Sequence, residues 1–167
     1  MSQSLLEASG AIRVRSDVER KRLFGLSALQ SSQEHVAGGI YDSASTARTY
    51  ARLLDVAAAA LPAGWPVIVD AAFLRADERA VFASLAKQLG VPFAILDCRA
   101  QMAVLRERLL QRQARGGDPS EADVAVLERL SVVAEPLGDA EHAAAIVIDA
   151  GQPVSGDSLA RQWAQRA

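Results

Sequence analysis

The sequence has few of the residues that would build a membrane anchor or a disulfide framework. Cys98 is the only cysteine among 167 residues, which excludes intramolecular disulfide bonds. No apolar run approaches the roughly 18 consecutive residues of a membrane-spanning helix. The first ten residues, MSQSLLEASG, contain no basic residue and no long apolar stretch, so they do not resemble a secretory signal peptide. We therefore expect a cytoplasmic protein with no membrane partner.

Aromatic residues are also scarce, at 5% of the chain, although 50% of the residues are hydrophobic. A sizeable core is therefore expected, built mainly from alanine, valine, leucine and isoleucine. The length is typical of a single domain, which we place at residues 1–167. The net charge of −2 gives no general attraction to nucleic acid, so a nucleic-acid partner is not expected.

Lysine is nearly absent. Lys21 and Lys87 are the only two among the 18 basic residues, which leaves 18 − 2 = 16 arginines. A genome rich in GC codons would raise alanine and arginine together, and we attribute most of the total to it. A need for bidentate contacts with phosphate would also favour arginine. The arrangement of the arginines along the chain is a separate question.

Short apolar runs alternate with longer amphipathic segments along the whole chain. The runs are continuous and rich in β-branched residues, which is typical of strands covered on both faces. Strand–helix alternation predicts an α/β fold with a parallel sheet and right-handed crossovers. The predicted strands are 11–15, 66–70, 93–97 and 144–149, and the predicted helices are 17–26, 43–61, 76–89, 100–115, 119–134 and 156–166.

Three local patterns predict helix ends. SDVE (16–19) is a capping box with Ser16 as the N-cap. DPSE (118–121) has the same character, with Asp118 as the N-cap and a proline at the first helical position. Gly90 lies where the 76–89 helix should stop.

An aspartate stands at the carboxyl end of every predicted strand. Ligands of open parallel sheets bind at this edge, where acids can hold a metal or act as bases. Aspartate is also common in turns, and we favour that role for Asp97 and Asp149. Asp17 is not needed as a cap, because Ser16 precedes it. Asp70 ends VIVD, the pattern of a strand whose acid reaches a magnesium ion through water.

Three arginines form a stripe in the predicted 100–115 helix. Arg108, Arg112 and Arg115 are spaced i, i+4, i+7 and share one face, which ends at a glycine pair. Guanidinium groups beside a glycine hinge suit a lid that closes on phosphate. A solvated face paired with Glu107 and Glu121 is the equally weighted alternative.

Taken in order, four segments resemble the P-loop kinase-like ATPases, which are related to zeta toxins, polynucleotide kinases and small-molecule phosphotransferases. They are RVRSDVERKRLFG, STARTYARLL, VIVDAAFLRADERAVFASLAKQLGVPF and RERLLQRQARGGDPSEADVAVLE. The sequence is most similar to the ATPase half of two-domain bacterial proteins whose other half resembles an aminoglycoside phosphotransferase. The likeness covers about residues 5–149, and 67–93 and DPSEAD are its most specific parts.

The resemblance implies an ATP-dependent phosphotransferase that uses Mg²⁺. It makes Asp17 the general base that takes the proton of the acceptor hydroxyl, and it makes Arg20 a substrate-binding residue. It places Asp70 near the metal and the arginines of the stripe (108, 112 and 115) on the nucleotide phosphates. DAGQP, after the last strand, corresponds to the adenine contact. Tyr41 follows a glycine pair in a loop that could line the substrate pocket or merely turn the chain.

The sequence departs from this family at the Walker A loop, which needs Gly-Lys-Ser/Thr to hold the phosphates. No glycine in the chain precedes a lysine, and SQSLLEASG looks like the tail of the helix that follows the loop. We therefore expect a domain truncated at its N-terminus relative to the family, without the first strand. In the family that strand lies between the counterparts of 66–70 and 93–97. These two strands should now pair directly, or a second copy should fill the gap as a homodimer.

Two functions remain open. The first is an ATP-dependent phosphotransferase lineage acting on a small-molecule or nucleic-acid hydroxyl, impaired in this chain by the lack of Walker A and still expected to bind a small-molecule or nucleotide ligand. The alternative is a non-catalytic, degenerate P-loop module that binds a partner or forms part of a larger protein.

Overall fold

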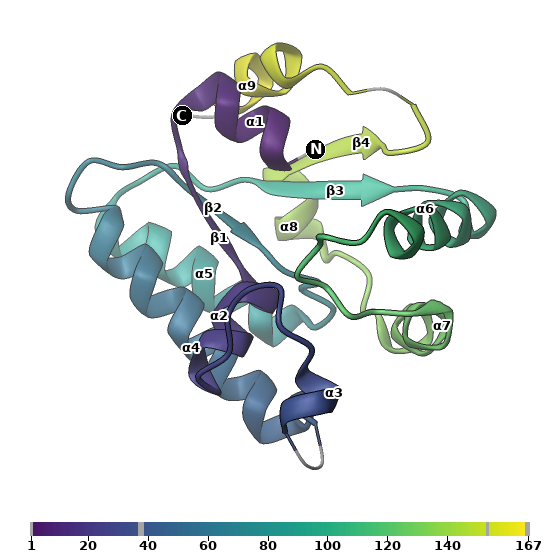
Figure 1. Ribbon diagram of the computed structural model, residues 1–167. Helices are drawn as coiled ribbons and strands as arrows, with labels where there is room; N and C mark the ends of the chain where they lie inside the picture. Colours follow the sequence, from purple (N-terminus) through teal and green to yellow (C-terminus); the bar gives the residue numbers. More distant parts are fainter. Residues whose placement is uncertain (1, 37–38, 153, 166–167) are drawn as a thin grey trace.

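The computed structural model describes residues 2–36, 39–152 and 154–165 and has the predicted α/β architecture, with parallel strands and helices on both faces (Figure 1). The strands are β1 (Ile12–Arg15), β2 (Val67–Asp70), β3 (Ile95–Arg99) and β4 (Ala145–Asp149). The helices are α1 (Ser2–Ser9), α2 (Ser16–Leu23), α3 (Ser32–His35), α4 (Ser43–Ala60), α5 (Ala76–Leu89), α6 (Met102–Arg115), α7 (Val124–Val133), α8 (Asp139–Ala144) and α9 (Gly156–Ala164).

The strands form two separate parallel pairs. β1 pairs with β2, from Ile12 opposite Val67 to Arg15 opposite Asp70. β3 pairs with β4 in the same sense. Of the two expected alternatives, direct pairing of the 66–70 and 93–97 strands is wrong, whereas a second copy in the gap stays a prediction. A cavity lined by residues of both strands lies between β2 and β3 instead.

Helices cover the strands from two sides. In Figure 1, α1 and α9 lie together on one side and α4 and α5 on the other. Alternating residues of β2 pack against both groups of helices. Ile68 packs toward α1 and α9, whereas Val67 and Val69 pack toward α4 and α5. The first core cluster contains Leu5, Ala11, Ile68, Ile146, Ile148 and Leu159, and the second contains Val14, Leu53 and Phe82.

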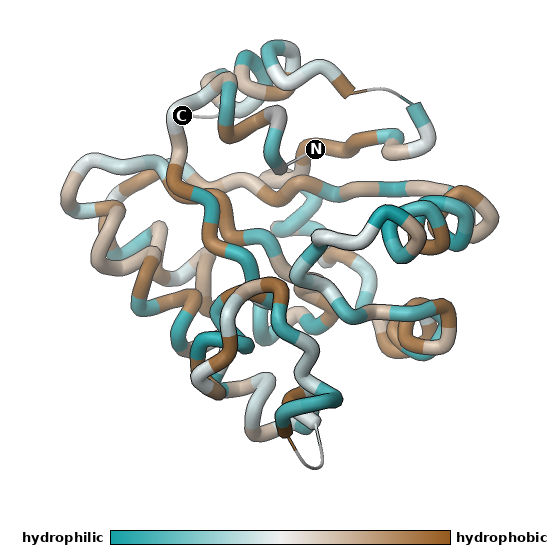
Figure 2. Tube along the Cα trace, viewed as in Figure 1, coloured by the Kyte–Doolittle hydropathy of each residue, from teal (hydrophilic) through white to brown (hydrophobic). Residues whose placement is uncertain are grey.

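The hydropathy colouring reflects this arrangement. In Figure 2 the strands are largely hydrophobic, whereas α3 is mostly hydrophilic. Helix α7 is an exception, because it carries many hydrophobic residues and none of its described side chains is buried. Val132, near its end, is 84% exposed. The α6–α7 hairpin therefore lies at one side of the domain (Figure 1), where α6 buries Leu109 and α7 buries none of its described side chains.

Two of the three predicted helix ends are wrong. β1 runs directly into α2, so Arg15 occupies the N-cap position and Ser16 lies inside the first turn without a capping bond. α7 begins at Val124 with Asp123 as its cap, whereas the carboxylate of Asp118 accepts from the backbone N–H of Ser120 and from Arg15. The left-handed conformation of Gly90, with φ of 64°, confirms the predicted end of α5.

Other element boundaries differ from the predicted ones by a few residues. β3 lies two residues later than predicted, because its ladder with β4 extends to Arg99 opposite Asp149. Two short helices, α3 and α8, were not predicted. The interpretation of SQSLLEASG as helical is confirmed by α1.

Candidate active site

The first group of predicted residues lies at the carboxyl end of β1. Because α2 starts immediately after the strand, Asp17 falls in its first turn, where a negative charge is favourable. Its carboxylate is partly buried. It is close enough to Arg20 and Tyr41 to affect the pKa of both side chains. The structure thus brings together the predicted base and the two predicted substrate-binding residues.

Arg20 is fixed from several sides. It is only 7% exposed. Its Nη1 donates to the carbonyl of Ile40 at 3.1 Å and to Oγ1 of Thr46 at 3.2 Å. The guanidinium carbon lies 5.0 Å from the centre of the Tyr41 ring, within the range of a cation–π contact. Burial lowers the pKa of Arg20, against the opposing effects of Tyr41 and Asp17. Its Nε is buried and has no hydrogen-bond partner among the described residues.

Tyr41 completes this group, which we call the acceptor cluster (Asp17, Arg20 and Tyr41). Partial desolvation, followed by the charges of Asp17 and Glu121, raises the pKa of Tyr41 to about 12. The phenol therefore stays protonated at neutral pH and can donate its hydroxyl proton to a ligand oxygen. Its ring is 47% exposed, so a ligand can reach it.

A second group surrounds Arg15, which the sequence patterns did not single out. Its Nη2 lies 3.2 Å from Oδ1 of Asp118, and its Nε lies 3.9 Å from Oδ2 of Asp70. Burial alone would raise the pKa of Asp118, but hydrogen bonds from Ser120 and Arg15 outweigh it and lower the pKa. Arg15 therefore joins the acid at the end of β2 to the loop that follows α6. The available signal was its position as the last residue of β1.

The 116–123 loop is tied to the acceptor side by a buried ion pair. Nζ of Lys21, a residue only 2% exposed, lies 3.0 Å from Oε1 of Glu121. The backbone N–H of Ser32 donates to the same oxygen at 2.7 Å. Burial would raise the pKa of Glu121, but these partners lower it. The same loop thus contacts Arg15 through Asp118 and the α2–α3 region through Glu121.

The arginine stripe is only partly engaged. Arg112 donates to the carbonyl of Ala122 at 3.2 Å, which holds it against the 116–123 loop. Arg108 and Arg115 are exposed and form no hydrogen bond or ion pair within the described ranges. The alternative pairing with Glu107 and Glu121 is not seen, because Glu107 accepts from Gln111 and Glu121 is bonded as described above.

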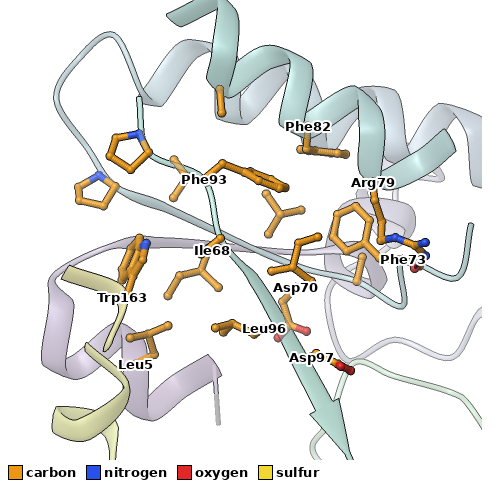
Figure 3. Close-up of a pocket in the computed structure, with 18 of the residues that line it drawn as sticks. Leu5, Ile68, Asp70, Phe73, Arg79, Phe82, Phe93, Leu96, Asp97 and Trp163 are labelled. Atoms are coloured by element: carbon orange, nitrogen blue, oxygen red, sulfur yellow. Dashed lines mark hydrogen bonds between the residues drawn. The ribbon is translucent and has the colours of Figure 1, made fainter. Parts of the chain in front are cut away.

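Asp70 provides at most one ligand for a magnesium ion. Figure 3 shows it near Asp97, at the same end of the cavity between β2 and β3. Among the described residues there is no group of three His, Cys, Asp or Glu side chains that could hold a metal. Magnesium prefers octahedral oxygen ligands and keeps several waters, so a bound ion would rely on water and nucleotide phosphates for the remainder. The site fits Mg²⁺ carried by a nucleotide and does not fit a resident metal.

A further buried arginine, Arg79, was not predicted from the sequence. Arg79 on α5 is 5% exposed and pairs through Nε and Nη2 with the carboxylate of Glu141, at 2.5 and 3.0 Å. Its remaining donors reach the carbonyls of Phe73, Glu135 and Pro136. Arg79 therefore anchors the segment that returns from the α6–α7 hairpin. An arginine within the apolar face of a predicted helix was the only signal.

No helix in the described part of the chain is long and apolar enough to cross a membrane.

Comparison with known proteins agrees with the fold. No curated protein matches the chain. A sugar kinase from Janibacter sp. is 20% identical with a TM-score of 0.64, covering 99% of this chain and 86% of its own. A proposed kinase from Chloroflexus aurantiacus is 22% identical with a TM-score of 0.69, covering 99% and 89%. A gluconokinase from Sinorhizobium meliloti is 18% identical with a TM-score of 0.59, covering 96% and 78%.

The family comparison is the more specific one. The AAA domain family matches residues 1–137, which is most of the chain. This match, together with the kinase folds of the structural neighbours, confirms the P-loop kinase-like resemblance, although not the subfamily of two-domain proteins. The chain belongs to the AAA domain family.

Proposed function

We propose that the chain is the acceptor-binding and lid portion of an ATP-dependent phosphotransferase that acts on the hydroxyl of a small molecule. The acceptor cluster supports this proposal most directly. A carboxylate, a buried guanidinium and a protonated phenol converge at the carboxyl end of β1. Ligands of open α/β sheets bind at this edge.

Each member of the cluster has a distinct role. Asp17 accepts the proton of the acceptor hydroxyl as its oxygen bonds to the γ-phosphorus of ATP and the bond to the leaving ADP oxygen breaks. Arg20 and Tyr41 orient the acceptor through their N–H and O–H groups. Arg20 is held rigidly by Ile40 and Thr46, so this orientation is set before the acceptor binds.

The phosphate side is less complete. Arg112 and the exposed Arg108 and Arg115 are the cations that the α6–α7 lid can bring to the nucleotide, and Asp70 would hold its Mg²⁺. When bound, the ion neutralises charge on the phosphates. The sequence contains no Gly-Lys dipeptide, so the backbone cradle and lysine of a Walker A loop are absent from it. We therefore expect phosphoryl transfer by this chain to be impaired.

Among acceptors, a sugar or sugar acid is favoured over a nucleic-acid hydroxyl. The solved structures that share the fold include a sugar kinase and a gluconokinase. The net charge of −2 also disfavours nucleic acid. We extend the proposal to a single domain at 1–167 and to a cytoplasmic location.

The alternative is a non-catalytic module of the same fold that binds a partner. The observation that favours it is the cavity between β2 and β3, which leaves the sheet divided. The two functions differ in what the acceptor cluster must do, because only the phosphotransferase needs it to bind a hydroxyl compound.

Acceptor binding and phosphoryl transfer together test the proposal. Sugars, sugar acids and nucleosides would be added to the labelled chain, and the NMR signals of residues 17–20 and 41 followed. Product formation with ATP and Mg²⁺ would be followed by phosphorus NMR. We expect a sugar or sugar acid to shift these signals and to be phosphorylated slowly. If no hydroxyl compound shifts them and no product forms at millimolar ATP, the non-catalytic alternative replaces this proposal.

A further inference from the structure

Buried cationic side chains in the described part of the chain differ in how their charge is matched. These side chains are Arg20, Lys21 and Arg79. Lys21 is paired with the carboxylate of Glu121, and Arg79 with that of Glu141. Arg20, in contrast, forms no ion pair with a carboxylate of the described residues, and its contacts are with neutral groups. A buried charge without a counter-ion is costly, so Arg20 is the one that requires a partner from outside the protein.

Arg79 shows how this chain satisfies a buried guanidinium group. Its Nε and Nη2, which lie on the same edge of the group, donate to the two carboxylate oxygens of Glu141 at 2.5 and 3.0 Å. Its Nη1 donates to the backbone carbonyls of Phe73 and Glu135. Two parallel N–H···O bonds from one edge of an arginine are a strong and specific way of holding a carboxylate. The edge formed by Nε and Nη2 is therefore the carboxylate-binding edge.

Arg20 repeats this arrangement in part. Its Nη1 is bonded to oxygens of Ile40 and Thr46, much as Nη1 of Arg79 is bonded to carbonyls. Its Nε is buried and has no hydrogen-bond partner among the described residues, and its Nη2 forms no hydrogen bond with them either. Buried polar groups in proteins are almost always bonded. The edge that holds Glu141 in Arg79 thus has no carboxylate from the described residues in Arg20.

Asp17 is the carboxylate of the chain that comes closest to this role. It lies three residues before Arg20 on α2, and its charge opposes the effect of burial on the pKa of Arg20. The two side chains nevertheless form no ion pair or hydrogen bond with each other in the described structure. Under the proposed function, the carboxylate of Asp17 receives the acceptor hydroxyl. Asp17 and Arg20 would therefore contact different groups of one ligand.

We propose that the edge of Arg20 formed by Nε and Nη2 binds a carboxylate of the phosphoryl acceptor, which makes the acceptor a hydroxy acid rather than a neutral polyol. This inference rests on the proposed function, because Asp17 has to receive a hydroxyl of the same molecule. Tyr41 can donate its O–H to the same carboxylate.

Binding at this edge requires a movement of neighbouring side chains, because Nε is buried. The ring of Tyr41 lies 5.0 Å from the guanidinium carbon and is 47% exposed, so it has room to move. A bound carboxylate should therefore change the surroundings of both Arg20 and Tyr41, and both can be followed by NMR.

The test compares gluconate with sorbitol on the full 167-residue chain. The two compounds have the same carbon skeleton, and a carboxylate in gluconate replaces one terminal CH₂OH of sorbitol. Calorimetry measures both affinities, and NMR follows the Nε–H signal of Arg20 and the ring signals of Tyr41. We expect gluconate to bind at least about tenfold more tightly than sorbitol and to shift both sets of signals, because only gluconate can form the paired bonds.

Two variants assign the effect to the guanidinium edge. Arg20→Lys keeps the positive charge but removes the planar pair of donors. We expect it to lower gluconate affinity about tenfold, close to that of sorbitol, while sorbitol affinity changes less than about threefold. Arg48→Lys makes the same exchange at an exposed position of α4 and should leave both affinities unchanged. Circular dichroism checks that both variants fold, and the comparison of ligands on the parent chain does not depend on them.

The outcomes separate this inference from the proposed function. Equal affinity for gluconate and sorbitol, or gluconate binding that leaves the Nε–H signal of Arg20 unmoved, would overturn carboxylate recognition, while phosphorylation of either compound would still support the phosphotransferase. Gluconate binding that depends on Arg20 without any phosphorylated product would support the carboxylate site and remove the phosphotransferase. An equal shift of the Arg20 signal by sulfate would show general attraction of anions and overturn the inference, as would absence of gluconate binding to the folded chain.

Discussion

The two edges of β2 have opposite surroundings. One edge pairs with β1 over four residues and ends beside Arg15 and the acceptor cluster. The other edge faces the cavity and the equally unpaired edge of β3. The proposed acceptor cluster lies at the end of the paired edge, whereas the cavity beside the other edge is lined mainly by apolar side chains.

This difference shows which part of a phosphotransfer site the chain builds by itself. On the paired side, Arg20, Lys21 and Glu121 are buried or bonded and hold fixed positions. On the phosphate side, Arg108 and Arg115 are exposed on a projecting helix. Fixed groups contribute more to catalysis than mobile ones, because they need no reorganisation in the transition state. Under the proposed function, the groups for the acceptor are therefore held more rigidly than those for the nucleotide.

Removing the carboxylate from the acceptor cluster should have the largest effect on this comparison. Asp17→Asn should lower the rate of phosphoryl transfer by roughly 10²–10⁴-fold, since the general base is lost. ATP affinity should barely change. Single-turnover assays of the variant beside Asp55→Asn, which removes an exposed acid from α4, provide the measurement and its control. Equal rates in the Asp17 variant and the parent chain would exclude Asp17 as the base.

Removing the side chain of Arg79, which lines the cavity, should destabilise the fold. Arg79→Ala leaves Glu141 without its ion pair and three carbonyls without their donor, so we expect the free energy of unfolding to fall by about 2–4 kcal/mol. Urea denaturation measures this loss. Arg75→Ala, which removes an exposed partner of Asp77 one turn earlier, should change stability far less. Similar losses for both variants would contradict a structural role specific to Arg79.

Much of the fold could be predicted from the sequence because its signals are local. Alternation of β-branched runs and amphipathic segments located all four described strands within two residues. The cavity between β2 and β3 could not be predicted in this way, because the residues that line it, such as Leu5, Phe82 and Trp163, are far apart in the chain. The bond between the carboxylate of Asp118 and Arg15, 103 residues away, is likewise invisible to a local pattern.

For the candidate site, too, local signals were informative and long-range contacts were missed. Asp17 and Arg20 are three residues apart on one helix, and Tyr41 lies beside them as the loop interpretation allowed. The i, i+4, i+7 spacing placed Arg108, Arg112 and Arg115 on one face, but it carried no information on where the hairpin projects. Arg15 and Lys21 were missed because their partners, in the 116–123 loop, are distant in sequence.

Acid should weaken the attachment of the 116–123 loop to the α2–α3 region. The pKa of Glu121 is lowered in the folded chain, so its charge stabilises the fold above the unfolded pKa of about 4.3, and this contribution is lost as pH falls through the lower folded value. Glu121→Gln should therefore flatten the dependence of unfolding free energy on pH between about pH 5 and 3. Glu34→Gln, an exposed change on α3, is the control. An unchanged slope in Glu121→Gln would show that Glu121 makes no such contribution.

The smallest effect is expected for nucleotide binding. The nearby cations are Arg15, already shared with Asp118, and the partly solvated arginines of α6. Exposed charge pairs contribute only about 0–1 kcal/mol each, so ATP should bind no more tightly than about 1 mM, or about 4 kcal/mol. Magnesium should change this little, since Asp70 is the one protein ligand proposed for it and the described residues contain no group of three acids that could hold a metal.

Calorimetry of the 167-residue chain with ATP, with and without Mg²⁺, measures this affinity. Arg112→Ala should weaken ATP binding about two- to fivefold, because Arg112 is held against the 116–123 loop. Arg129→Ala, on α7, should leave ATP binding unchanged. Micromolar affinity in the parent chain would contradict the comparison of the two edges of β2. It would mean that backbone groups around Gly116 and Gly117, both at positive φ, already form a phosphate cradle.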